Sequence, residues 1–176
     1  MLFSKYVGCG NDFILIDNRD LKFPVNDRLK ISNLCARQFG IGADGIILLE
    51  DSKTADFKMR IFNSDGSEAE MCGNGIRCLF KFIHECNGPS SSYLIETKAS
   101  TFLIEQDKTC IDHVLTTMQD PVDISWNISL KVDQETLQVH YLNTCVPHTV
   151  IFTDVIKESD LKEKALEKQK IWKEFE

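Results

Sequence analysis

The chain has 176 residues, of which 43% are hydrophobic and 27% charged, the composition of a folded globular protein rather than a disordered or fibrous one. Its formal net charge of −7 argues against a nucleic-acid or anionic-membrane partner, because no basic surplus is available to neutralise phosphates. No apolar run reaches the roughly 18 residues that span a bilayer, and the first residues lack the pattern of a secretory signal. We therefore expect a cytoplasmic protein with a small-molecule partner.

The strands expected in the first half of the chain cover residues 2–7, 13–17, 45–50 and 56–63. The first two are joined by a glycine turn. In the fourth, Phe57, Met59 and Ile61 alternate with charged residues, which is typical of a strand with one buried face.

Two helices are expected among these strands. The first begins at the Asn26–Asp27 cap, carries Leu29, Leu34, Cys35 and Phe39, and ends at Gly40. The second begins after Cys72 and ends at the Asn87-Gly88-Pro89 stop. Its apolar residues recur at helical spacing, which predicts one thoroughly buried face; they are Ile76, Leu79, Phe80 and Ile83.

The second half of the chain continues with an antiparallel meander over residues 93–98, 102–106 and 110–118. Asp120–Pro121 is the expected domain boundary, and two further strands are expected at 137–142 and 149–153, followed by a charged helix at 160–175. The predicted organisation is an N-terminal half at residues 1–118 and the incomplete start of a second half at 119–176.

Seven cysteines are a high count for this length. Their number is odd, their spacing is irregular and no Cys-x-x-Cys pair occurs, so neither a disulfide framework nor a metal centre is expected. Most should be small buried groups. Those assigned to packing are Cys9, Cys35, Cys78, Cys86 and Cys110.

The strongest functional signal is Cys72–Gly75 at the start of the second helix. A helix N-terminus presents unpaired N–H groups and partial positive charge, which favour an anion. A thiol there can become a competent base or nucleophile. The glycines leave room for a ligand, and Asn74 can hydrogen-bond a carboxylate. The local pattern alone is equally compatible with a helix-capping cysteine that has no chemical role.

Two other glycine-rich turns carry asparagines, Asn11 in residues 10–13 and Asn63 in residues 62–66. Each alone is typical of ordinary turn chemistry. Together with Cys72, Gly73 and Asn74, they would suit the carboxylate and ammonium groups of an amino acid.

Four segments resemble, in order and spacing, the N-terminal motifs of the diaminopimelate epimerase family. They are Gly10-Asn11-Asp12-Phe13, Gly40-Ile41-Gly42-Ala43-Asp44-Gly45, Phe62-Asn63-Ser64-Asp65-Gly66-Ser67-Glu68 and Cys72-Gly73-Asn74-Gly75-Ile76-Arg77-Cys78. The resemblance implies an α+β fold of two pseudo-symmetric halves, each a curved antiparallel sheet wrapped around a central helix. This chain would hold the first half and part of the second.

The resemblance also implies an isomerase activity. The family interconverts LL- and meso-diaminopimelate in lysine and peptidoglycan precursor biosynthesis, without pyridoxal phosphate or a metal. Two cysteines face opposite sides of the α-carbon, where one removes the proton and the other delivers one. Complete members indicate a homodimer.

Carried over residue by residue, the resemblance makes Cys72 the first catalytic cysteine. Substrate binding falls on Asn11, Asn63, Gly73 and Asn74. His148, in a Val-Pro-His segment similar to one early in the second domain of the family, has a supporting role. Gly45 stands where some members have a glutamine contact, so no side-chain role transfers there.

The sequence also lacks the motifs that complete members of the family carry in their second half. The second cysteine motif, Ala-Cys-Gly-x-Gly, does not occur among the 176 residues, so we expect a truncated chain that lacks the second catalytic cysteine. Cys145 is the one candidate replacement and is better explained as an incidental substitution. Two alternatives stay open: another cofactor-independent racemase, such as a proline racemase-like enzyme, and an inactive remnant that binds a ligand or partner.

Overall fold

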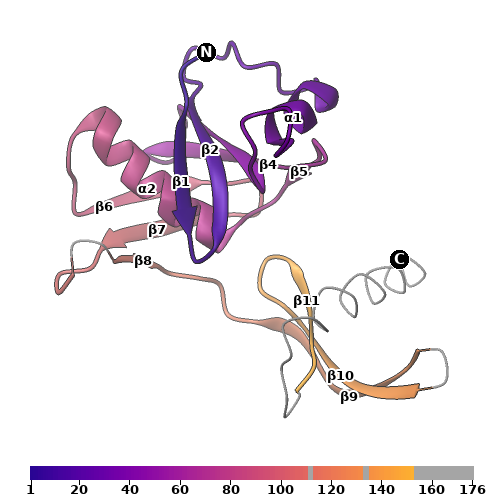
Figure 1. Cartoon of the computed structure of the whole chain (residues 1–176). Helices are drawn as coiled ribbons and strands as arrows, with labels where there is room; N and C mark the ends of the chain where they lie inside the picture. The colour runs from indigo at the N-terminus through magenta and orange to yellow at the C-terminus, as the bar shows by residue number, and fades with distance from the viewer. Residues whose placement is uncertain (111–112, 133–134, 153–176) are drawn as a thin grey trace. The chain divides into compact units, whose positions relative to one another are not determined.

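The computed structural model describes residues 1–110, 113–132 and 135–152 (Figure 1). The chain divides into two compact units. The first comprises Met1–Pro121 with Thr144–Val146, and the second comprises Val122–Asn143 and the residues from Pro147 onward. The charged helix expected at residues 160–175 lies outside the described residues.

The first unit is built on one sheet, in the order β1-β2-β3-β4-β6-β7-β8, with the short β5 paired to β4. The strands are β1 (Ser4–Gly8), β2 (Asn11–Asp17), β3 (Gly45–Glu50), β4 (Phe57–Asn63), β5 (Glu68–Ala69), β6 (Ser92–Glu96), β7 (Thr101–Gln106) and β8 (Val114–Thr116). The expected strands are present. The short β5 is not among the expected strands, and β8 is shorter than the expected 110–118, of which 111 and 112 lie outside the described residues.

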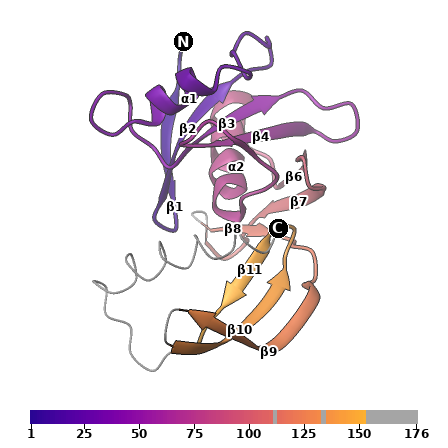
Figure 2. The same ribbon diagram turned by 90° about the vertical axis from the view of Figure 1, so that its right-hand side faces the viewer.

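The sheet is mixed, because β2–β3 and β4–β6 pair in parallel while the other neighbours are antiparallel. Parallel neighbours need a crossover connection. Helix α1 (Arg28–Cys35) lies in the first crossover and α2 (Gly73–Asn87) in the second. Figure 2 shows α2 in the middle of this unit, with β1 and β2 on one side and β6 and β7 on the other. The expected α+β fold of a curved sheet around a central helix is confirmed. The expectation of an antiparallel sheet is wrong at two pairs, because the crossovers through α1 and α2 make their flanking strands parallel.

Two apolar clusters explain why β2 and β3 are almost continuously hydrophobic. Alternate residues of both strands join a cluster that includes α2, and the residues between them join a cluster that includes α1. The α2 cluster takes Phe13, Leu15, Ile47 and Leu49, and the α1 cluster takes Ile14, Ile16, Ile46 and Leu48. Strands buried on both faces lose the polar alternation of a half-exposed sheet.

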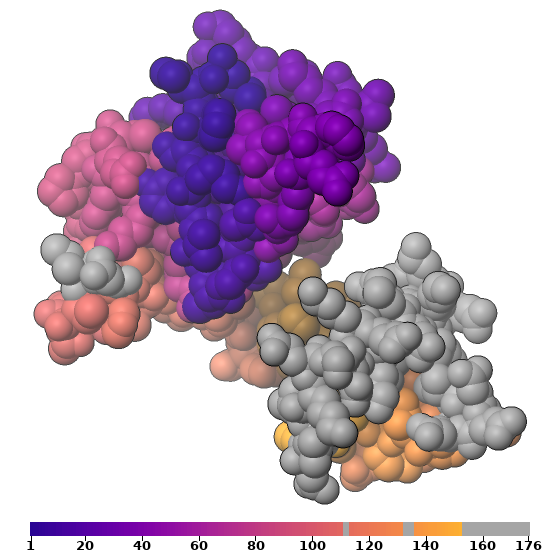
Figure 3. Space-filling model, in the orientation of Figure 1, coloured from indigo at the N-terminus to yellow at the C-terminus, as the bar shows by residue number. Residues whose placement is uncertain are grey.

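Helix α2 has the buried face that its spacing predicts. Ile76, Leu79, Phe80 and Ile83 are all fully buried. The helix ends at Gly88, whose φ of 88° is in the left-handed region that glycine adopts without strain. On the face shown in Figure 3, the indigo residues of β1 and β2 cover the middle of the unit.

Helix α1 ends earlier than predicted. Ala36 already has extended geometry, so the helix stops at Cys35 rather than at Gly40. The chain then folds back on the helix, because the N–H groups of Ile41 and Gly42 donate to the carbonyl of Leu34. Of the apolar residues that this helix was expected to carry, Cys35 is buried, together with Ile31. Leu29 and Phe39 are 72% and 94% exposed.

The second unit contains a three-stranded antiparallel sheet in the order β11-β10-β9 within the described residues. Its strands are β9 (Val122–Val132), β10 (Glu135–Asn143) and β11 (Pro147–Val150). Strand β9 is not among the expected strands. The expected strands at 137–142 and 149–153 correspond to β10 and β11, with residue 153 outside the described residues. The boundary at 118/119 and the identity of this unit as the start of a second half stay predictions.

No helix in the described ranges is long and apolar enough to cross a membrane.

Candidate active site at the start of helix α2

One edge of the first sheet gathers the loops that carry the predicted site residues. Parallel strands β2 and β3 begin at this edge, with Phe13 opposite Gly45, and antiparallel β4 ends there, with Asn63 opposite Gly45. Asn11 is the first residue of β2. Neighbouring strands lie about 4.8 Å apart, so Phe13 and Asn63, which are both paired with Gly45, are roughly 10 Å apart. Asn11 lies two residues before Phe13.

Cys72 is the N-cap residue of α2. Its backbone is extended, with φ −147° and ψ 116°, and its Sγ accepts the N–H of Gly75 at 3.4 Å. The sulfur therefore takes one of the N–H groups that a helix start leaves without a partner, at the positive end of the helix dipole. The side chain is half-buried and packs against the α2 cluster.

Two glycines bring the first turn of α2 close to the sheet. A Cβ on Gly75 would lie 2.9 Å from Ile47 Cδ1, and a Cβ on Gly8 would lie 2.8 Å from Cys78 Sγ and 3.0 Å from the Asn74 carbonyl oxygen. Gly73 differs, because no described residue, apart from its chain neighbours and the backbone of its own helix, comes within 4 Å of the position of its Cβ. The backbone beside Cys72 is thus open on the Gly73 side, as a ligand site requires.

The close approach of β1 to α2 joins two of the predicted site residues. Asn74 Nδ2 donates to Asn11 Oδ1 at 2.8 Å. Asn11 Nδ2 donates in turn to Asp44 Oδ2 at 3.1 Å, and Arg77 donates to Asn74 Oδ1. Neither Asp44 nor Arg77 is among the site residues expected from the sequence. The available signals were their places in the motifs and the i, i+3 spacing of Asn74 and Arg77 on one helix face.

A cluster of charged side chains supports the Asn11 loop. Arg37 donates to both Asp12 and Asp44 at 2.7 Å, and Lys5 donates to Asp12 at 2.8 Å. These cations hold the pKa of the Asp12 carboxyl well below its usual range. Asp44 also accepts the backbone N–H of Asp12 at 3.2 Å, which ties the loop before β3 to the start of β2.

Asn63 and His148 are not part of this hydrogen-bonded group. The Asn63 side chain is exposed and donates to Ser67 Oγ at 3.0 Å within the turn that follows β4. His148 is exposed on β11 in the second unit, opposite Leu142. Their binding and supporting roles stay predictions.

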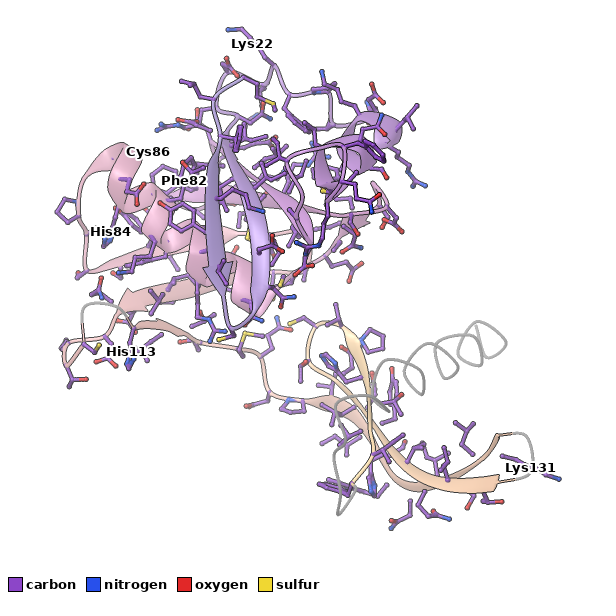
Figure 4. All side chains as sticks on the ribbon, in the orientation of Figure 1. Lys22, Phe82, His84, Cys86, His113 and Lys131 are labelled. Carbon is purple, nitrogen blue, oxygen red and sulfur yellow. The ribbon has the colours of Figure 1, made fainter. Side chains whose placement is uncertain are left out.

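All seven cysteines are free thiols. Cys35 and Cys78 are buried as expected, and burial raises the pKa of Cys78 to about 11. The packing prediction is wrong for Cys9, which is exposed in the β1–β2 turn, and for Cys86, which is exposed in the last turn of α2 (Figure 4). Cys145 is half-buried and donates to Gln119 Oε1 at 3.1 Å.

A groove of about 970 Å³ lies beside Phe82 and Cys86, in the second half of α2. Its other walls are residues 1–4, 16–20, 22–24 and Lys30. None of the predicted site residues lines it.

The sequence model of the diaminopimelate epimerase family matches residues 3–122. The chain belongs to this family. It is 39% identical over 166 residues to the diaminopimelate epimerase of Flavobacterium psychrophilum, with 92% of this chain and 59% of the relative covered. It is 42% identical over 180 residues to the diaminopimelate epimerase of Trichodesmium erythraeum, with 90% and 62% covered. The chain thus spans about 60% of the length of these relatives.

Solved structures share the fold at low sequence identity. A phenazine biosynthesis protein of the PhzF family from Bacillus anthracis matches with a TM-score of 0.60 and 18% identity, over 85% of this chain and 53% of that one. A hydroxyproline epimerase from Agrobacterium vitis matches with a TM-score of 0.59 and 13% identity, over 85% and 50%. At these identities the likeness bears on the fold alone.

Proposed function

We propose that this chain supplies the first catalytic cysteine, Cys72, of a diaminopimelate epimerase that interconverts the LL and meso isomers of its substrate. The observation that carries the proposal is the position of the Cys72 sulfur. It caps α2, beside an open backbone at Gly73 and two residues before Asn74, which bonds to Asn11. The family membership and the four motifs support the same assignment.

In the proposed reaction, the Cys72 thiolate removes the α-proton on one face, and the electron pair of the C–H bond is left on carbon, delocalised toward the carboxylate. A second thiol on the opposite face then donates a proton to that carbon. The first N–H groups of α2 stabilise the charge that develops on the substrate carboxylate. Asn11, Asn63 and Asn74 orient the amino acid, so that the Cα–H bond faces the base.

The second thiol is assigned by resemblance to a motif that does not occur among these 176 residues. Cys72 by itself is therefore proposed to carry out one half of the reaction, proton exchange on one face. We propose that the complete enzyme is a cytoplasmic homodimer that uses no cofactor or metal and binds no nucleic acid.

The test uses the 176-residue chain in deuterated water with LL- and meso-diaminopimelate, and mass spectrometry of the recovered substrate. We expect α-deuterium in one of the two isomers, because a single base reaches one face. Cys72→Ala should abolish the exchange. Cys86→Ala should not, since that exposed thiol lies at the other end of α2.

A second measurement separates the alternatives. Alkylation of Cys72 by iodoacetamide is followed by peptide mass spectrometry with and without diaminopimelate. Slower alkylation without deuterium exchange would identify an inactive chain that binds its ligand. Slower alkylation with proline, and none with diaminopimelate, would identify a proline racemase-like enzyme. No effect of either amino acid would refute a substrate site at Cys72.

A further inference from the structure

A chain of hydrogen bonds crosses the proposed site and uses both ends of each asparagine amide. Asp44 Oδ2 accepts from Asn11 Nδ2 at 3.1 Å, and Asn11 Oδ1 accepts from Asn74 Nδ2 at 2.8 Å. Asn74 Oδ1 accepts from Arg77. The participants come from three separate segments: the loop before β3, the start of β2, and the first turns of α2.

The two ends of this chain determine the orientation of both amides. An ionised carboxylate can accept hydrogen bonds but cannot donate them, so Asn11 must turn its NH₂ group toward Asp44. Its oxygen then faces Asn74, which must donate through its own NH₂ group. A guanidinium can donate but cannot accept, so the oxygen of Asn74 is the atom that fits Arg77. Either amide, once flipped, would set two donors or two acceptors against each other.

The carboxylate end is itself held in place. Asp44 Oδ1 accepts from Arg37 at 2.7 Å, and Asp44 Oδ2 also accepts the backbone N–H of Asp12 at 3.2 Å. At the other end, Arg77 also donates to Cys9 Sγ at 3.4 Å. Both ends are therefore tied to neighbouring loops, rather than hanging free in solvent.

We propose that Asp44 and Arg77 are positioning residues that fix the amide polarity of Asn11 and Asn74, that is, which end of each side-chain amide donates and which end accepts. Each amide nitrogen gives one hydrogen to the chain, and among the described residues its second hydrogen has no assigned acceptor. The pair thus presents N–H donors of fixed orientation to the substrate. The inference rests on the proposed function for the identity of that substrate, but the fixed polarity is a property of the protein alone.

The first experiment tests the polarity without any ligand. Side-chain NH₂ signals of Asn11 and Asn74 are recorded by ¹H–¹⁵N NMR and assigned by their loss in Asn→Ala variants. In Asp44→Asn the acceptor-only end is gone, and we expect the signals of both asparagines to move. The matched control Asp20→Asn, which removes an exposed carboxylate paired with Lys22, should leave them in place. Movement of the Asn11 signal alone would overturn the proposal.

The arginine end has a conservative control. Arg77→Lys keeps a group that only donates, so the Asn74 signal should stay near its original position. Arg77→Gln offers both a donor and an acceptor, and the Asn74 signal should move. Equal effects of the two substitutions would show that Arg77 acts through packing and not through polarity.

The second experiment measures the consequence for binding. The concentration of diaminopimelate that halves the alkylation rate of Cys72 should rise about tenfold in Asp44→Asn, as expected when a charge-assisted hydrogen bond is lost, and should be unchanged in Asp20→Asn. If diaminopimelate gives no protection in the unaltered chain, the proposed function fails, while the NMR test still decides the polarity. If diaminopimelate protects Cys72 equally well in Asp44→Asn and in the unaltered chain, the positioning role is overturned and the proposed function stays intact.

Discussion

The tight contact between β1 and α2 makes Gly8→Ala a sharp test of how the site is built. An added Cβ would lie 2.8 Å from Cys78 Sγ and 3.0 Å from the Asn74 carbonyl oxygen. Neither atom can yield cheaply, because Cys78 is buried and the carbonyl belongs to the helix backbone. The backbone conformation is not the obstacle, since Gly8 is not among the glycines with positive φ.

The expected magnitude follows from two opposing effects. Overpacking of a filled core costs about 1–3 kcal/mol. Replacing glycine by alanine recovers about 0.4–1 kcal/mol, by reducing the entropy of the unfolded chain. Taking the middle of each range, we expect Gly8→Ala to lower the free energy of unfolding by roughly 1.3 kcal/mol. It should also separate Asn11 from Asn74, whose 2.8 Å bond depends on the same approach.

Gly73→Ala is the matched control, because no described residue beyond its chain neighbours and the backbone of its own helix lies within 4 Å of its added Cβ. This variant should keep or slightly raise the stability of the unit, by up to about 1 kcal/mol. Its methyl group would occupy the open space beside Cys72, so the protection of Cys72 by diaminopimelate should be lost.

Urea unfolding followed by far-ultraviolet circular dichroism, with hydrogen exchange of the α2 amides, measures both variants. Tryptophan fluorescence is unsuitable, since residues 1–121 contain no tryptophan. A Gly8→Ala chain as stable as the original, or a Gly73→Ala chain that still binds, would refute the reasoning about these contacts.

Three further predictions follow from the packing of the first unit. Arg60 donates to Glu68 at 2.6 Å and lowers the pKa of that carboxyl. The pair therefore stabilises the fold at pH values above 4.5, the ordinary pKa of a glutamate, and this stabilisation is lost as the pH falls through the pKa of Glu68 in the folded protein. In Glu68→Gln, the urea midpoint should no longer fall with this loss at acid pH. At about pH 8, iodoacetamide should label exposed Cys9 and spare Cys78, whose pKa burial raises to about 11; labelling of both at one rate would contradict the buried position. Asn18→Ala should lower the free energy of unfolding in urea by about 1–3 kcal/mol, because it removes the amide that bonds the buried Glu50 carboxylate and the buried backbone N–H of Phe23. An unchanged free energy of unfolding would contradict that account.

Helix α2 and its cap could be predicted from the sequence because their signals are local. The apolar spacing, the cap position of Cys72 and the glycine stop all lie within residues 72–89, and the structure agrees with each. The paired strands β6 and β7 were similarly accessible, because the turn between them is short.

The end of α1 could not be predicted in the same way. Gly40 has the sequence signature of a C-cap, but its N–H group bonds to Ala36 after the helix has already ended. Packing decides this stretch, since Ile31 and Cys35 bury in the α1 cluster while Phe39 stays in solvent. Strand β9 is a different case, because the alternation of apolar and polar residues at 122–132 is an ordinary local signal of a strand. This strand could have been predicted from the sequence.

In the site, too, the local features could be predicted from the sequence and the long-range contacts could not. The cap geometry of Cys72 is local, whereas Asn11 and Asn74 are 63 positions apart in sequence and meet only because β1 approaches α2. The roles of Asp44 and Arg77 depend on that meeting. A hydrogen-bond partner across such a separation leaves no periodic trace in a single sequence.

The glycines around the first turn of α2 show how the fold locates the thiol. Gly8 and Gly75 are sites of close approach, where a methyl group would push the helix away from β1 or from Ile47. These two glycines set how closely the start of the helix approaches the sheet, and therefore the position of Cys72. Gly73, between Cys72 and Gly75, faces open space instead, and there the missing side chain leaves room rather than allowing contact. The same residue type thus serves opposite purposes within a few residues, which is why substituting Gly8 should damage the fold while substituting Gly73 should damage only binding.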